Sequence, residues 1–168
     1  NDPNDPRRWN RLFVNNGSNQ YTDQAAAYGA QDQEQTWATD FGDYDNDGDL
    51  DMVSIEHSTG TQLFENDGTG HFTNATTGSG LGVAMFPLQC MFRDLDNDGF
   101  LDVLIAGGSE FFLKGSGDGT FTAVSGLFPY TKPMHGFAFG DLNRDGFEDV
   151  YANYGSGYVD ASQPDPDL

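Results

Sequence analysis

The sequence predicts an all-β fold built from repeated units of four short antiparallel strands. Three similar acidic nonapeptides begin at residues 43, 94 and 141, so that their starts are 51 and 47 residues apart. A second marker recurs in step with them, and short apolar runs between the markers are bounded by Gly, Asn and Asp. Four strands in a repeat of about 50 residues match the size of one β-propeller blade.

The composition narrows the function classes. The chain has 168 residues, with 27 acidic and 7 Lys or Arg residues, which gives a formal net charge of -20. A nucleic-acid binder that neutralises phosphates through a basic surface is excluded, because it needs clustered Lys and Arg. No apolar run is long enough to cross a membrane as a helix. The single cysteine, Cys90, permits no internal disulfide.

The second marker predicts a hairpin in each unit. An apolar strand, a turn of Asn, Asp, Ser and Gly, and an aromatic-Thr strand follow one another at residues 12–22, 63–73 and 112–122. Of the segments between markers, only Asp23–Tyr28 with its three alanines has helical character. It is too short for a stable helix, so we expect a loop or a strand end.

Two further strands are expected in each unit, one on either side of each acidic nonapeptide. The strands before it lie at residues 37–41, 89–92 and 136–139, and those after it at residues 50–56, 101–107 and 148–154. Their β-branched and aromatic residues are typical of strands. Each complete unit therefore contains four strands.

The phase of these strands divides the chain into partial and complete blades. We expect a Pro- and Asp-rich linker at residues 1–8, a propeller segment at residues 9–157, and a Pro- and Asp-rich linker or tail at residues 158–168. The propeller segment divides into a half blade (9–30), two blades (36–80 and 86–128) and a half blade (134–157). Closed propellers have four to eight blades. The sequence therefore predicts an incomplete propeller, or one that another chain or segment completes.

The acidic nonapeptides, which we name loop one (residues 43–51), loop two (94–102) and loop three (141–149), are predicted calcium sites. Side chains at positions 1, 3 and 5 of a tight loop converge on one point, Gly at position 6 allows the turn, and the position 7 carbonyl and the position 9 acid complete an all-oxygen shell. The ligands would be Asp43, Asp45, Asp47, the carbonyl of Asp49 and Asp51; Asp94, Asp96, Asp98, the carbonyl of Phe100 and Asp102; and Asp141, Asn143, Asp145, the carbonyl of Phe147 and Asp149.

The charge of these loops favours a bound cation over three solvated acidic turns. The ligand positions supply four, four and three aspartates in the three loops, and such clusters repel one another without a cation. An EF-hand is excluded, because position 12 is Ser54, Ile105 and Ala152 instead of Glu, and the flanking segments are predicted strands.

These motifs resemble the FG-GAP/VCBS repeat family, which forms the calcium-loop blades of integrin-α-type propellers and of many secreted bacterial proteins. The resemblance rests on the acidic loop feeding an apolar strand, on Phe-Gly before loops one and three, and on the hairpin marker Asn10–Ser18. It extends over about residues 9–157. Before loop two the sequence has Phe92-Arg93 instead of Phe-Gly, which predicts a looser turn there.

The resemblance implies three structural Ca²⁺ sites on the rim of a propeller and an extracellular, cell-surface or periplasmic location, where weak sites fill. We expect a non-enzymatic protein for adhesion, ligand or glycan binding, or surface assembly. Two alternatives stay open: a fragment or accessory domain of a secreted polysaccharide-active enzyme, and a purely structural shell or filament protein. The expected partner is another copy of the chain or the rest of a longer parent chain. A glycan or a cell-surface protein is a further possible partner, and nucleic acid and membrane insertion are not expected.

Overall fold

The computed structural model contains strands as its regular elements throughout the part of the chain that it describes, and each strand pairs antiparallel to its neighbour. The described residues are 5–6, 9–32, 34–56, 59–81, 87–107, 111–128 and 134–154. Most of the expected linker at residues 1–8 and all of the expected tail at residues 158–168 lie outside these ranges. The all-β prediction is confirmed.

Two four-stranded blades form the centre of the molecule. In the first, the strand order is β3-β4-β5-β6, with bounds β3 (Thr36–Gly42), β4 (Asp51–Glu56), β5 (Gly60–Asn66) and β6 (Phe72–Asn74). The second pairs its strands in the same meander, with bounds β7 (Pro87–Arg93), β8 (Asp102–Gly107), β9 (Phe111–Gly115) and β10 (Phe121–Val124).

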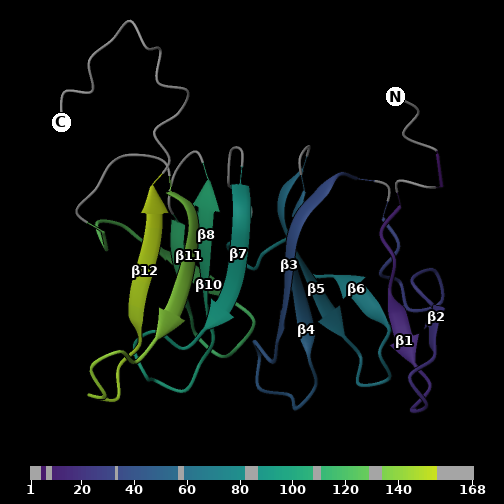
Figure 1. Ribbon diagram of the computed structural model, residues 1–168, viewed down its shortest axis with the longest axis horizontal. Coiled ribbons are helices and arrows are strands. Elements are labelled where there is room, and N and C mark those ends of the chain that lie inside the picture. The colour runs from purple at the N-terminus through teal and green to yellow at the C-terminus, as the bar shows by residue number, and fades with distance from the viewer. Residues whose placement is uncertain are drawn as a thin grey trace, which may run out of the picture.

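A two-stranded hairpin lies at either end of this pair of blades (Figure 1). The first hairpin joins β1 (Phe13–Asn15) to β2 (Tyr21–Asp23), and β11 (Met134–Gly140) pairs with β12 (Asp149–Tyr154). Among the described residues the blades form an open row, and the two hairpins occupy opposite ends of it. The chain is therefore an incomplete propeller in these ranges. Turn structure follows β2, as expected for Asp23–Tyr28.

Burial on both faces explains why β8 is apolar without alternation. All six residues of β8 are buried: Val103 and Ile105 belong to the core shared with the first blade, while Leu104 and Ala106 belong to the core shared with β11–β12. A strand with both faces covered needs apolar residues at successive positions. The β8 strand also pairs with β11 at one point, Gly107 with Met134.

A backbone hydrogen bond joins the last strand of each complete blade, β6 or β10, to the segment that ends the unit before it. The N–H of Phe121 donates to the carbonyl of Ser79 at 2.7 Å, and the N–H of Phe72 donates to that of Tyr28 at 2.8 Å. Gly80 follows Ser79 with φ at +88°, and a Cβ there would lie 2.2 Å from the carbonyl oxygen of Phe121. The neighbouring blades thus approach each other more closely than a residue with a side chain permits.

Gly80→Ala tests this close approach. We expect a melting temperature several degrees below that of the wild-type protein, because the change adds a backbone clash to the positive φ. Strained backbone of this kind costs roughly 1–3 kcal/mol. The matched control is Gly78→Ala, since Gly78 also has a positive φ (+91°) but has nothing within 4 Å of an added Cβ. Equal melting temperatures for the two variants would show that the blades do not meet at Gly80.

Candidate metal centre

The three acidic loops follow β3, β7 and β11 and share one backbone conformation. Each has a left-handed residue at position 4, with φ of +61°, +59° and +65°, and a left-handed glycine at position 6, with φ of +98°, +89° and +90°. The residues are Asn46, Asn97 and Arg144 at position 4, and Gly48, Gly99 and Gly146 at position 6. Asn tolerates this conformation better than most side chains, and Gly adopts it at no steric cost.

The carboxylates themselves hold this turn. The position 1 aspartate accepts the N–H of the position 6 glycine in each loop, at 3.2, 2.9 and 3.0 Å. The position 5 aspartate accepts the N–H of position 7, at 3.1, 3.0 and 2.9 Å. The loop sequence therefore folds back on its own side chains, which draws the oxygens of the loop inward.

In loops one and two, the position 9 aspartate connects the loop to the third strand of its blade. Asp51 is fully buried, and its carboxylate accepts the N–H of Tyr44 at 3.3 Å and the N–H of Asn66 on β5 at 2.9 Å. Asp102 is buried in the same way and accepts two backbone N–H groups at 3.0 Å, from Leu95 and from Gly115 on β9.

Loops one and two each bring three carboxylates together. Oxygen atoms of the aspartates at positions 1, 3 and 9 lie within 4.8 Å of one another in both loops; these are Asp43, Asp45 and Asp51, and Asp94, Asp96 and Asp102. In loop one, Oδ1 of Asp43 and Oδ1 of Asp49 are buried without a hydrogen-bond partner. A buried carboxylate oxygen that receives no donor fits a cation ligand, because leaving it unpaired is costly.

The predicted metal ligands at positions 5 and 7 are placed differently from those at positions 1, 3 and 9. Asp47 and Asp98 face the N–H of position 7, and neither belongs to the carboxylate trio of its loop. The carbonyls of Asp49, Phe100 and Phe147 stay predicted ligands.

Loop three has the same backbone hydrogen bonds but more exposed side chains. Asp141, Asn143 and Asp145 are exposed, and because position 3 is Asn143, the loop lacks the position 3 acid that completes the carboxylate trio of the other two loops. Asp149 accepts the N–H of Leu142 at 2.9 Å. Within the described ranges, β12 has no third strand beside it, so no strand supplies a donor equivalent to Asn66 or Gly115.

The buried aspartates at position 9 of loops one and two have raised pKa values. Burial raises the pKa of Asp51 to about 6, against the two backbone donors that lower it, and the charges of Asp45 and Asp47 raise it further. Burial also raises the pKa of Asp102, with the charges of Asp96 and Asp98 as additional causes. A bound cation would reverse this effect, because it favours the ionised carboxylates.

The looser turn expected before loop two stays a prediction, and Arg93 has two partners there. Arg93 pairs with Glu148 at 3.3 Å and its guanidinium lies 6.0 Å from the ring centre of Phe139. At the equivalent place in the first blade, a Cβ on Gly42 would come within 2.6 Å of Leu101 in the next blade. Arginine fits before loop two because its neighbours there are a carboxylate and an aromatic face, which leave it room.

Lys114 is a charged residue beside loop two that the nonapeptide pattern does not include. It lies on β9, outside the nonapeptide, and its Nζ contacts Asp96 and Asp98. A signal was present: when the hairpin markers are aligned, Lys114 replaces Glu65 at the same position of the preceding unit.

The comparisons with known families agree with the geometry. The profile of an FG-GAP-like repeat matches residues 43–105 and 94–152, which together span more than half of the chain. The chain belongs to the FG-GAP-like repeat family. Each FG-GAP match begins at an acidic loop and ends in the strand that follows the next loop, β8 or β12. The family repeat therefore joins the last strands of one blade to the first strands of the next.

No curated protein matches the chain significantly. Within the described residues, no helix has the length and apolar character needed to pass through a bilayer.

Proposed function

We propose that this FG-GAP protein is an extracellular, non-enzymatic propeller segment whose acidic loops bind calcium and stiffen one edge of the blades. The observations that carry the proposal are the closeness of the carboxylates of Asp43, Asp45 and Asp51 and a buried oxygen of Asp43 that has no hydrogen-bond partner. The same trio in loop two, one repeat later, supports it. The proposed role of the stiffened blades is binding, adhesion or surface assembly.

Calcium is the ion that suits this donor set. All candidate ligands are oxygens, which selects a hard cation, and an irregular shell of six or seven ligands suits Ca²⁺ better than the strict octahedron of Mg²⁺. The loops are short and exposed over much of their length. Sites of this kind fill where calcium is millimolar, which is the basis for proposing an extracellular, cell-surface or periplasmic location.

A non-enzymatic role is supported by how the buried carboxylates are engaged. Asp51 and Asp102 each accept one backbone N–H from their own loop and one from the third strand of their blade. Buried Glu56 accepts hydrogen bonds from Thr36 at 2.9 Å and Ser54 at 2.6 Å. These hydrogen bonds give all three carboxylates a role in stabilising the blades. An accessory role beside a polysaccharide-active enzyme, or a shell role, stays as the alternative.

Chelation tests the calcium proposal. EDTA should lower the melting temperature sharply and excess calcium should restore it, because each filled site stabilises by roughly 2.7 kcal/mol when free calcium is about 100-fold above Kd. Asp45→Ala should remove one site and leave the others near their wild-type affinity in calorimetric titration. The matched control is Asn46→Asp, at a position that is exposed and is not a ligand. Melting that is identical with and without EDTA would refute structural calcium.

We also propose that the free edge of β12 is completed by a strand from another copy of the chain or from the rest of a longer parent. The equivalent strand β4 is buried at all six residues, whereas β12 is only partly buried and Tyr151 is 68% exposed. An uncovered strand edge invites pairing. Light scattering of the 168-residue chain in calcium should show a dimer if a second copy completes the edge. A monomer that gains stability when covalently extended beyond residue 168 would favour the longer parent, and a monomer unaffected by extension would contradict the proposal.

Glycan binding is the form of recognition that can be tested most directly. Trp37 and Tyr151 are exposed by 51% and 68%, and exposed aromatic rings are suited to stacking on sugar rings. We expect selective signals on a glycan array in calcium, reduced by Trp37→Ala and Tyr151→Ala. Leu142→Ala, at an apolar side chain that is 80% exposed, is the control. Incubation with pectic and other polysaccharides should release no product; cleavage would instead establish the enzymatic alternative.

A further inference from the structure

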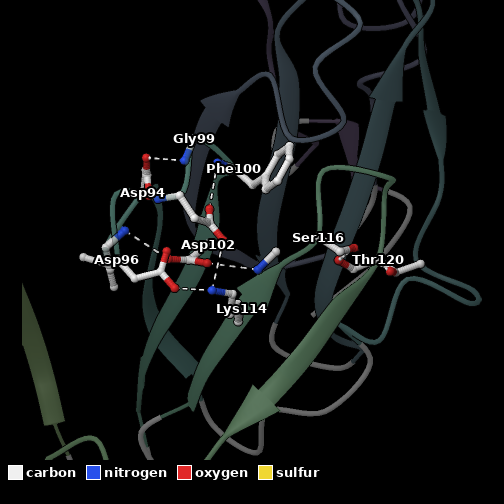
Figure 2. Close-up of polar contacts among 11 residues, drawn as sticks. Asp94, Asp96, Gly99, Phe100, Asp102, Lys114, Ser116 and Thr120 are labelled. Atoms are coloured by element: carbon white, nitrogen blue, oxygen red, sulfur yellow. Dashed lines mark hydrogen bonds and ion pairs between the residues drawn. The ribbon is translucent and has the colours of Figure 1, made fainter.

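Loop two has a cation that belongs to the protein. Lys114 extends from β9, and its ammonium contacts Oδ2 of Asp96 and lies 2.9 Å from Oδ2 of Asp98 (Figure 2). Asp96 is one of the three carboxylates that converge in this loop, and Asp98 is its position 5 acid. A positive charge therefore lies against one carboxylate of the trio and against the position 5 acid of the loop.

The equivalent position of the first blade carries the opposite charge. Lys114 immediately precedes Gly115, whose N–H donates to Asp102; Glu65 immediately precedes Asn66, whose N–H donates to Asp51. The side chains of Lys114 and Glu65 are therefore attached at equivalent positions of β9 and β5. Replacing Glu by Lys there changes the charge beside the loop by two units.

We propose that Lys114 determines the calcium affinity of loop two, by acting as a tethered cation that calcium must displace or tolerate. Loop one, with Glu65 in this place, takes calcium first, and loop two fills only at higher calcium. This inference rests on the calcium function proposed above and assigns different roles to two loops that have nearly the same sequence.

The geometry supports displacement instead of a permanent block. The Lys114 side chain is 41% exposed and the carboxylate of Asp96 is 42% exposed, so the ammonium can swing into solvent on its flexible stem. Exposed ion pairs of this kind are weak, because water screens both charges. A cation remaining a few ångströms from Ca²⁺ lowers the affinity by about tenfold even in a high dielectric.

The same contact places a positive charge among the aspartates of loop two. The ammonium of Lys114 touches two carboxylates of the loop, those of Asp96 and Asp98, so it offsets part of the repulsion among the aspartates. Loop one, with Glu65 at the equivalent position, has an additional negative charge there instead.

Lys114→Met tests the inference, because it keeps the aliphatic stem and removes the charge. Calcium is titrated calorimetrically into the full chain in an Asp45→Ala background, which removes a ligand of loop one. We expect the affinity of loop two to rise about tenfold relative to the same background with Lys114. In EDTA the melting temperature of Lys114→Met should fall below that of the wild-type chain, and saturating calcium should remove the deficit.

The matched control is Glu65→Met, titrated in an Asp96→Ala background. It should lower the affinity of loop one and leave melting in EDTA unchanged or higher. An isotherm unchanged by Lys114→Met, or a weaker one, overturns the role of Lys114 and leaves the calcium function standing. A wild-type chain that shows no calcium binding overturns the calcium function itself, and the role of Lys114 with it.

Discussion

In loops one and two, the hydrogen bonds to the buried carboxylate at position 9 are the interactions on which the blade depends. Asp51 and Asp102 are fully buried, and each accepts one N–H from its own loop and one from the third strand of its blade. One side chain thereby satisfies two backbone donors at the point where the loop, β4 or β8, and the hairpin meet. Burying a charge is tolerable only when it is paired and hydrogen-bonded in this manner.

This arrangement concentrates negative charge at one edge of the molecule. Each buried aspartate lies beside two further carboxylates of its loop, and burial together with these neighbouring charges raises its pKa. Two features offset this negative charge in otherwise equivalent loops: a geometry suited to a divalent cation in loop one, and a lysine from β9 in loop two. Sites that look the same in sequence therefore differ in their electrostatic surroundings.

Packing between blades follows from the same repeat. The second strand of a complete blade has neighbours on both faces, which is why Val103 and Leu104 are buried in different cores although they are adjacent in sequence. The hairpin β11–β12 lacks this second neighbour among the described residues, and its strand β12 is accordingly only half-buried. Loop three, which connects the two strands of that hairpin, is also the loop whose side chains at positions 1, 3 and 5 are exposed.

The sequence by itself determined the repeat, the strands and the loops. Its period, its turn residues and its Asp spacing are local properties, and local hydrogen bonds reproduce the same loop three times. It did not reveal that the position 9 acids of loops one and two are fully buried, because that depends on the third strand, which supplies the second donor to each of them. It also missed the contacts of Arg93 and Lys114, since their partners, Glu148, Phe139, Asp96 and Asp98, come from other strands or loops. Contacts between elements fix these charges, and only the tertiary structure decides them.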